Sequence, residues 1–271
     1  MTAHQRSRMF DDIAGSYDRG FTERLPGRWL RSLVQEKIVG LLPPASRILE
    51  IGCGTGEDAV EFAKLGHNVI ASDVSQAMLR QARQKLLNQP VKIRERVQIE
   101  WLDAANPTAF APNLECNFEL VFSNFGALNC IEDLRPIFSY AHEHLKPGGH
   151  LAVTLMGRFC AWETLGFALR GDFKRMRRRW NGHGRWSKGE TVHSVWYPTV
   201  GSVRQAAGSG FQRVAIYGIG ALLPSTEFFG VCERWPGFFG GLAKLENVIA
   251  GWWPVNRTSD HFLIVLRKEL A

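Results

Sequence analysis

The chain has no closely spaced cysteines, although it contains five of them. They are odd in number and far apart, at Cys53, Cys116, Cys130, Cys160 and Cys232. No Cys-x-x-Cys pair is present, so the spacing excludes the disulfide framework of a small secreted domain. The acids and histidines also lack the spacing of metal ligands. We therefore expect a protein of the reducing cytoplasm with no metal site.

Long apolar runs are missing as well. No stretch reaches the ~18 uncharged apolar residues that a membrane-spanning helix needs. The richest segment, 228–255, is interrupted by Glu233, Arg234, Lys244 and Glu246. Residues 1–9 are polar and basic, and the apolar core of a signal peptide does not follow them. The sequence therefore predicts neither a spanning helix nor a secretory leader.

Internal repeats and low-complexity segments are also absent, but the chain is long and basic. Its 271 residues suffice for one large α/β domain with insertions, or for a domain and a cap. The formal net charge of +7 suits acidic lipid surfaces, nucleic acid or anionic substrates. No RNA- or DNA-binding motif accompanies this charge, which disfavours nucleic acid as a partner.

A glycine-rich turn stands near the start of the chain. Residues 48–56 read Ile-Leu-Glu-Ile-Gly-Cys-Gly-Thr-Gly, an apolar run that ends in three alternating glycines. Helical spacing follows at Ala59, Phe62 and Ala63. A strand, a glycine turn and a helix bring backbone close to a nucleotide-like ligand, because glycine permits positive φ and close approach.

The residue after the glycines separates two kinds of ligand. A dinucleotide motif needs a third glycine where Glu57 stands, and Asp58 follows it. Two carboxylates there would repel a pyrophosphate, which disfavours an NAD enzyme. A ligand with adenosine, no phosphate and positive charge fits better, and S-adenosylmethionine is such a ligand. Glu50 can face its ammonium group or the amides of the loop. A glycine turn without a ligand is the alternative.

The motif Glu-x-Gly-x-Gly-x-Gly resembles motif I of the class I S-adenosylmethionine-dependent methyltransferases. The segment Phe-Asp-Asp-Ile-Ala-Gly-Ser-Tyr-Asp at 10–18 resembles a signature of the ubiquinone- and menaquinone-biosynthesis methyltransferases and their relatives. This resemblance implies that Tyr17, on a helical arm over 1–42, helps to close the site. The alternative for Tyr17 is a packing contact of a mobile arm.

An acid follows the glycine turn at the distance expected for a ribose ligand. Asp73 ends the second strand, twenty-one residues after Gly52, where a carboxylate can accept from both ribose hydroxyls. The resemblance extends over Asp-Val-Ser-Gln-Ala-Met and implies that Met78 packs near adenine. It also implies that Asp103 and the amide of Ala104 contact adenine. The alternatives are that Ser75 or Asp73 caps the helix 76–88 and that Asp103 is an exposed loop acid.

The fourth strand, 118–124, is apolar enough to be buried on both faces, and its carboxyl end should face the ligand crevice. Ser123, Asn124 and Phe125 should then lie near the methionine part of the cofactor, and Asn129 should point into the crevice. The candidate cofactor residues are Tyr17, Glu50, Gly52, Cys53, Gly54, Gly56, Asp73, Val74, Met78, Asp103, Ala104, Asn124 and Phe125.

The order of strands and helices predicts a doubly wound, parallel α/β sheet. The resemblance, which covers about two-thirds of the chain, implies a seven-stranded Rossmann-like sheet whose last strand is antiparallel. Lys-Pro-Gly-Gly at 146–149 should lead into a strand at 150–156. We expect the sixth and seventh strands at 211–219 and 261–267. The predicted organisation is an N-terminal helical arm at 1–42 and a methyltransferase domain at 43–271.

Two segments depart from the family pattern, 158–196 and 221–259, and both can fold over the crevice as a cap. They hold seven of the nine tryptophans: Trp162, Trp180, Trp186, Trp196, Trp235, Trp252 and Trp253. This clustering indicates a hydrophobic or planar acceptor, or else packing of the cap onto the domain. A general base is needed only if the acceptor must lose a proton. Candidates by residue type and position are His193, Glu163 and His183.

The cap contains a basic stretch at 170–188. Phe173, Met176 and Trp180 lie at helical spacing among lysines and arginines, which is typical of a helix on an anionic membrane surface or of a solvated face. We expect S-adenosylmethionine-dependent methyl transfer to a small lipophilic or aromatic acceptor. The alternatives are a cofactor-binding protein without turnover, and methylation of a lipid or quinone at the membrane surface.

Overall fold

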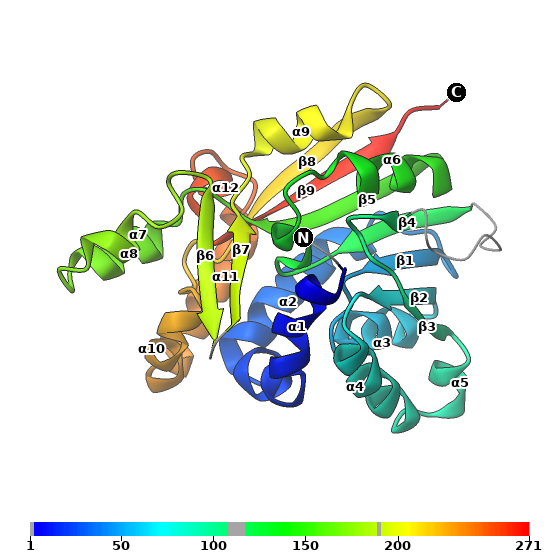
Figure 1. Ribbon diagram of the computed structural model, residues 1–271, viewed down its shortest axis with the longest axis horizontal. Coiled ribbons are helices and arrows are strands. Elements are labelled where there is room, and N and C mark those ends of the chain that lie inside the picture. The colour runs from blue at the N-terminus through cyan, green and yellow to red at the C-terminus, as the bar shows by residue number, and fades with distance from the viewer. Residues whose placement is uncertain (1–2, 108–116, 189–190, 271) are drawn as a thin grey trace.

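A mixed sheet of seven strands forms the centre of the protein (Figure 1). The computed structural model describes residues 3–107, 117–188 and 191–270, without the side chains of residues 4, 9, 186–188 and 191–193. The strands are β1 (Arg47–Ile51), β2 (Asn68–Asp73), β3 (Val97–Trp101), β4 (Phe118–Ser123), β5 (Leu145–Met156), β8 (Phe211–Ile219) and β9 (His261–Lys268). Their order across the sheet is β3-β2-β1-β4-β5-β9-β8.

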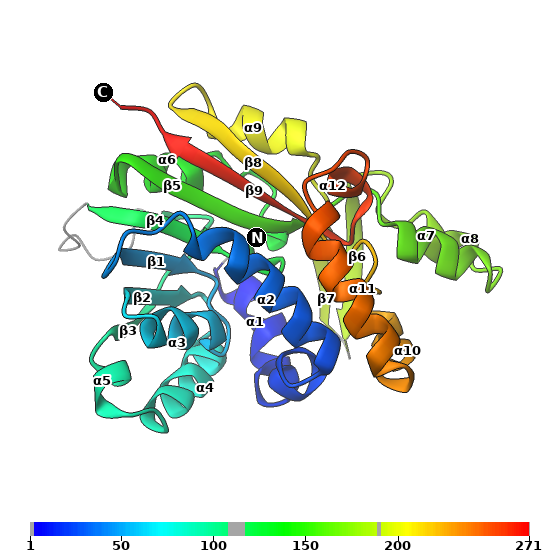
Figure 2. The ribbon, with the colours of Figure 1, turned by 180° about the vertical axis from the view of Figure 1, so that it is seen from behind.

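The five strands β1 to β5 pair in parallel, and β9 runs antiparallel to both of its neighbours. This arrangement confirms the predicted sheet with its antiparallel last strand. Apolar residues alternate between the two faces, so that Leu49 and Ile51 join one core and Ile48 joins the other. Helices α6 (Arg135–His144) and α9 (Val200–Ala207) cover the first core, and α2 (Leu25–Val39) and α3 (Glu57–Lys64) cover the second (Figures 1 and 2).

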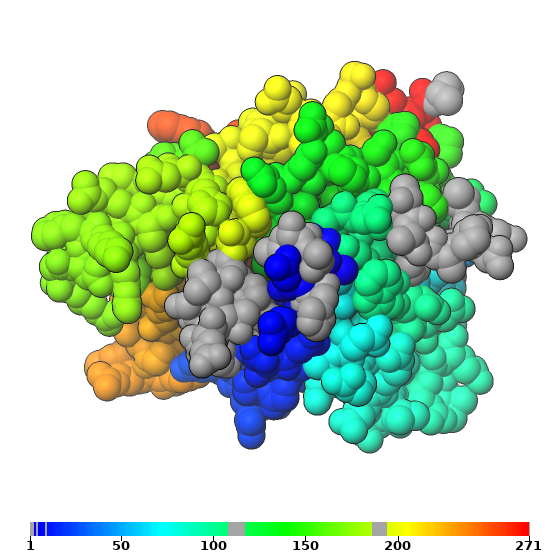
Figure 3. Space-filling model, viewed as in Figure 1, coloured from blue at the N-terminus to red at the C-terminus, as the bar shows by residue number. Residues whose placement is uncertain are grey.

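The remaining elements surround the carboxyl ends of the strands or connect them. The N-terminal arm consists of α1 (Ala3–Ile13), η1 (Ala14–Ser16), η2 (Asp18–Thr22) and α2. Other short elements are α4 (Gln76–Leu87), α5 (Val91–Arg94), η4 (Ala127–Cys130), α7 (Ala161–Ala168), α8 (Phe173–Met176), η5 (Thr226–Phe228), α10 (Phe229–Arg234), α11 (Pro236–Ile249) and α12 (Val255–Thr258). In Figure 3 the blue arm lies at the middle of the face that carries α4 and α7–α8.

The basic stretch 170–188 does not form the predicted amphipathic helix. Only α8 is helical there, and the chain then forms strand β6 (His183–Lys188), which pairs with β7 (Thr191–Trp196). Gly171 and Gly182 adopt φ angles of 71° and 77°, which interrupt a helix. Two of the arginines also turn inward to buried carboxylates, so ion pairing overrides the helical spacing. No helix in the described part of the chain is long and apolar enough to cross a membrane.

Candidate active site

A cavity opens where β1, β2 and β4 end, as expected for a parallel sheet. It brings together most of the candidate cofactor residues. The candidates in its wall are Tyr17, Gly52, Gly54, Asp73, Val74, Met78, Asp103, Ala104, Asn124 and Phe125. The wall is completed by residues that the sequence did not single out as cofactor contacts, namely Arg6, Phe10, Ile51, Ala127, Leu128, Cys130 and Ile131. Phe10 begins the 10–18 signature and Ile51 belongs to the glycine-turn segment. The others carry no motif, and packing of the arm and of η4 brings them there.

The glycine loop has the left-handed backbone that its sequence predicts. The φ angles of Gly52, Gly54 and Gly56 are 72°, 54° and 76°. A Cβ atom on Gly52 would lie 2.2 Å from the Cβ atom of Ala127, so a side chain cannot be accommodated there. A Cβ atom on Gly54 would meet no atom within 4 Å. The loop therefore offers open main chain to the cavity.

Asp73 fixes this loop from the end of β2. Its Oδ2 atom accepts a hydrogen bond from the Gly54 amide at 2.9 Å, and Oδ1 accepts from the Ser75 amide at 2.8 Å. Burial raises the pKa of Asp73 in spite of these bonds. Each carboxylate oxygen has a second lone pair, so the same group can also accept from a ligand. The cap of α4 is a different residue, Ser75, whose Oγ accepts from the Met78 amide.

An arginine of the arm occupies the carboxylate of Asp103. The Arg6 Nε atom donates to Oδ1 at 3.2 Å, and its Nη2 atom forms an ion pair with Oδ2. The Ala105 amide also donates to Oδ1, at 3.1 Å. Both charged side chains are mostly buried. Helix α1 is thereby held over the cavity at the position that the resemblance assigns to adenine.

Three candidates, Glu50, Cys53 and Gly56, do not line the cavity. The Glu50 side chain is 1% exposed and accepts from the amide of Ala59 at the start of α3, so it faces backbone rather than a ligand. Burial and the nearby Asp58 raise the pKa of Glu50 well above its usual value. Burial likewise raises the pKa of the Cys53 thiol.

Behind the loop, a buried ion pair positions the end of β4. Arg31 of α2 pairs with Asp58, whose Oδ2 atom also accepts from Asn124 Nδ2 at 3.0 Å. The Arg31 guanidinium lies 5.2 Å from the centre of the Phe125 ring. Phe125 has a φ of 46°, which is uncommon for a residue other than glycine. Such strain persists where the surroundings hold it, and it is concentrated at functional sites.

Asn129 does not point into the crevice as predicted. Its side chain is fully buried, and its Nδ2 atom donates to the carbonyls of Met156 and Trp196 at 3.1 and 2.6 Å. Its Oδ1 atom accepts from the Met156 amide at 2.9 Å. All polar atoms of this amide therefore tie η4 to β5 and β7.

A second cavity of about 470 Å³ adjoins the first. Both cavities are lined by Phe10, Tyr17, Phe125 and Cys130. Its other apolar residues include Ile13, Phe21, Met156 and Val195. Its charged residues are Glu163, Arg178, Arg179, Glu227 and Asp260, and His261 lies beside them. This volume lies within the range of small-molecule sites. The 158–196 segment and the 221–259 segment both contribute to the wall, as expected for a cap.

Of the two candidate bases whose side chains the structure describes, Glu163 lines this cavity and His183 does not. His183 is exposed and packs against Trp196 outside both cavities. The side chain of His193 lies outside the described residues. Glu163 itself is 2% exposed. Its carboxylate accepts from Nε and Nη2 of Arg178 at 2.9 and 2.6 Å, and from Nε of Arg179 at 2.9 Å. Both oxygens of this carboxylate are therefore occupied by guanidinium groups.

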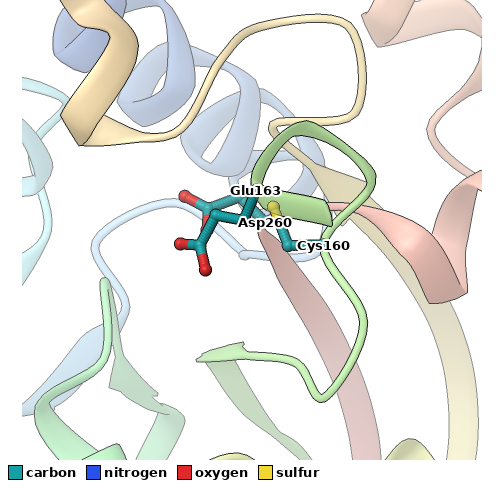
Figure 4. Close-up of side chains that lie close together, drawn as sticks. All are labelled: Cys160, Glu163 and Asp260. Carbon is teal, nitrogen blue, oxygen red and sulfur yellow. The ribbon is translucent and has the colours of Figure 1, made fainter. Parts of the chain in front are cut away.

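Cys160, Glu163 and Asp260 gather at the back of the cavity wall (Figure 4). Three such groups could hold a metal ion, but a cation of the chain already lies between the carboxylates. The Nη2 atom of Arg179 pairs with Glu163 and, at 2.6 Å, with Asp260 Oδ1. Burial also raises the pKa of the Cys160 thiol, which keeps it protonated. The cluster is therefore an ion-pair network.

Comparison with known proteins agrees with the geometry of the first cavity. Residues 49–151 match the model of a family described as a methyltransferase domain. An uncharacterized methyltransferase of Mycobacterium tuberculosis is 31% identical over 154 residues, which cover 55% of this chain and 73% of that protein. A demethylmenaquinone methyltransferase of Clavibacter sepedonicus is 29% identical over 153 residues, which cover 55% and 57%.

Two further similarities extend the comparison. The tRNA 5-carboxymethoxyuridine methyltransferase of Escherichia coli is 26% identical over 152 residues, which cover 55% of this chain and 56% of that protein. The phosphoethanolamine N-methyltransferase 2 of Haemonchus contortus, solved with S-adenosyl-L-methionine, has the same fold, with a TM-score of 0.61 and 22% identity over 96% of this chain and 57% of that chain. The chain belongs to the class I S-adenosylmethionine-dependent methyltransferases, and S-adenosylmethionine is its cofactor.

Proposed function

We propose that the protein methylates a small lipophilic or aromatic acceptor that binds in the second cavity. The observation that supports this proposal is the junction of the two cavities. Phe10, Tyr17, Phe125 and Cys130 line both, so a ligand in one would touch a ligand in the other across these side chains. Because the junction is mostly apolar and aromatic, it favours an apolar acceptor and excludes water.

The residues of the first cavity fit the cofactor. Asp73 would hold the ribose, Met78 would pack on adenine, and the open main chain of Gly54 would border the ligand. When bound, S-adenosylmethionine supplies a methyl group activated by its sulfonium. Asn124 and Phe125, fixed from behind by Asp58 and Arg31, would border the methionine part. Their task is to hold two reactants in line, and such alignment can account for most of a rate enhancement.

We propose further that the N-terminal arm is the lid of this site. Asp11 accepts from Ser75 Oγ at 2.6 Å, and Asp18 accepts from Thr55 Oγ1 at 2.6 Å. The cavity beneath has a volume of about 70 Å³, smaller than the ~300 Å³ at the lower end of small-molecule sites. The arm must therefore shift to admit the cofactor. Breaking the pair of Arg6 and Asp103 would open the adenine position.

The test uses the intact protein, calorimetric titration and labelled cofactor. Wild type should bind S-adenosylmethionine, and Asp73→Ala should weaken binding at least about tenfold, since a buried hydrogen-bonding carboxylate is lost. Incubation of wild type with a cell extract and methyl-labelled cofactor should label a small molecule that partitions into organic solvent. Label found only in RNA would contradict the proposed acceptor, and would match the activity named for the Escherichia coli relative.

We propose, as a second candidate function, that methylation takes place at an anionic membrane surface to which α7 and α8 bind. Leu165, Leu169 and Phe173 are 62%, 80% and 57% exposed on these helices. The cations Lys174 and Arg177 lie beside them and are exposed. Exposed apolar side chains among cations favour a lipid surface of negative charge. Figure 1 shows that this helix pair projects away from the sheet.

Vesicle sedimentation tests this contact. Wild type should co-sediment with vesicles that contain phosphatidylserine and remain in solution with neutral phosphatidylcholine. The double variant Lys174→Glu, Arg177→Glu should lose the binding, because each cation near such a surface contributes about 1 kcal/mol. The matched control is Arg80→Glu, Lys92→Glu, an exposed pair on α4 and α5, at the other end of the molecule from α7 and α8 in Figure 1. Wild type that never sediments, or equal losses in both variants, would rule the contact out.

A further inference from the structure

A histidine that the sequence did not single out lies in the second cavity, next to its junction with the first. His261 is the first residue of β9, and it lines the second cavity. Its ring lies edge-on to the ring of Phe125, with centroids 5.7 Å apart. Since Phe125 lines both cavities, the imidazole lies beside the place where the two ligands would meet.

One nitrogen of this ring faces a fixed carboxylate. The Nδ1 atom is buried and lies 3.2 Å from Oδ2 of Asp260, which is 3% exposed. At this distance the contact is electrostatic, without the geometry of a hydrogen bond. The other oxygen, Oδ1, accepts from Arg179 Nη2 at 2.6 Å, and the Asp260 carbonyl accepts from Arg179 Nη1 at 2.9 Å. Burial alone would raise the pKa of Asp260, but His261 and Arg179 outweigh it and hold that pKa below its usual value. Asp260 is therefore ionised.

The other nitrogen is available to a ligand. None of the described residues forms a hydrogen bond with Nε2 of His261. Unlike Nδ1, this atom is not fully buried, so a ligand in the second cavity can reach it. The other groups of this wall are already paired or stay protonated. Glu163 accepts from Arg178 and Arg179, and Glu227 accepts from Arg178. Burial raises the pKa of Tyr17, so that its hydroxyl stays protonated. His261 is the group with a free lone pair and an ionised partner behind it.

We infer that His261 is the general base of methyl transfer and that Asp260 positions it. This inference rests on the proposed function and narrows its acceptor to a molecule with an acidic O–H or N–H group, such as a phenol or an enol. His261 Nε2 takes the proton of that group, and the acceptor electron pair forms the bond to the methyl carbon. The pair of the carbon–sulfur bond stays on sulfur, so a neutral thioether leaves. The imidazolium that results is stabilised by the Asp260 carboxylate.

The protonation of the ring can be measured without any acceptor. In protein labelled with ¹⁵N at histidine, the His261 signals, assigned by their loss in His261→Gln, should at pH 8 report a proton on Nδ1 and a bare Nε2. Asp260→Asn should change the fraction of His261 rings that carry the proton on Nδ1 instead of on Nε2. A neutral ring with its proton on Nε2, or an imidazolium at that pH, would overturn the inference, because Nε2 could then not accept.

Transfer of label from methyl-labelled S-adenosylmethionine to a cell extract gives the second arm. His261→Gln should bind the cofactor as wild type does in calorimetry but transfer label at least about a hundredfold more slowly. Added imidazole should restore part of the rate in His261→Ala. His183→Gln, an exposed histidine outside both cavities, should leave the rate unchanged.

The outcomes separate the two proposals. If wild type labels no small molecule, the proposed function fails, and the inference that rests on it fails too. If wild type labels a small molecule and His261→Gln does so equally fast, the proposed function stands and the inference alone is overturned.

Discussion

The buried carboxyl group of Glu50 has an unusual environment for a charged group. Its Oε2 atom has no hydrogen-bond partner among the described residues, and Asp58 is the carboxylate that raises its pKa most. The Arg31 guanidinium lowers the pKa of Glu50, but burial and Asp58 outweigh it. Folding therefore favours the protonated form of this group, which makes its effect on stability depend on pH.

Glu50→Gln should stabilise the fold increasingly as the pH rises. The folded state holds the Glu50 proton to a higher pH than the unfolded chain does. Ionisation above the ordinary carboxyl pKa of about 4 therefore costs folding free energy, up to the raised pKa. Urea unfolding between about pH 5 and pH 8 gives the free energy of unfolding of both proteins. The difference in favour of the variant should grow by up to about 1.4 kcal/mol per pH unit. Glu100→Gln, an exposed strand residue, is the control. A difference in the free energy of unfolding that stays constant with pH would contradict the raised pKa of Glu50.

Arg6 provides a second prediction, because it occupies the carboxylate that would contact adenine. Arg6→Ala frees Asp103 and enlarges the cavity, so calorimetry should show S-adenosylmethionine binding about three- to tenfold more tightly, the equivalent of ~1 kcal/mol. Arg8→Ala, an exposed residue of the same helix, should bind as wild type does. Weaker binding in Arg6→Ala alone would mean that Arg6 contacts the cofactor instead of competing with it.

Individual residues differ in how far the sequence could identify them. Asp73 and the glycines could be predicted because their positions follow from a strand, a turn and a fixed number of residues. Arg6 and His261 could not, because their partners are Asp103, far along the chain, and a cavity formed by separate segments. Asn129 was assigned wrongly to the crevice, since nothing in its neighbourhood reveals that the carbonyls of Met156 and Trp196 approach it.

The strands and the caps show the same contrast between local pattern and tertiary contact. The sixth and seventh strands were predicted at 211–219 and 261–267 from the resemblance to the family, and they lie at Phe211–Ile219 and His261–Lys268. The 170–188 segment was predicted as a helix from its periodicity. There the ion pairs of Arg178 and Arg179 with Glu163 decide the path of the chain.

The 221–259 segment is attached to the sheet through one buried glutamate. Glu246 of α11 is fully buried, and its carboxylate accepts from four successive amides. Oε1 accepts from Gly220 and Ala221, and Oε2 accepts from Leu222 and Leu223, at 2.5 to 3.0 Å. Such a row of amides forms a nest for an anion. The turn after β8 and helix α11 therefore form one unit.

Glu246→Gln should destabilise the protein by at least about 2 kcal/mol. The NH₂ group of glutamine would face two backbone donors, and each buried donor left without an acceptor costs ~1–3 kcal/mol. Chemical denaturation measures the loss. Glu143→Gln, an exposed residue of α6, should change the free energy of unfolding by less than about 0.5 kcal/mol. Equal effects of the two variants would mean that the four amides find other partners.

The cofactor cavity joins distant parts of the chain, since β1, β2, β4 and the N-terminal arm all contribute to its wall. A ligand that contacts all of them binds only when they are assembled. The binding free energy is then added to the stability of the whole unit. In the described residues, the arm is also tied to this unit independently of the ligand, through Asp11 with Ser75 and Asp18 with Thr55.

S-adenosylmethionine should therefore raise the melting temperature of the entire protein in a single transition. At a hundred times its Kd, a ligand that binds only the folded state adds about 2.7 kcal/mol, which for a chain of this size corresponds to roughly 5–10 °C. At the same cofactor concentration, the melting temperature of Asp73→Ala should rise by about half as much or less. A tenfold weaker affinity reduces the added free energy to about 1.4 kcal/mol. Scanning calorimetry measures both. A cofactor shift confined to one of two separate transitions would mean that the arm and caps unfold apart from the sheet, and that the site is completed only after they dock.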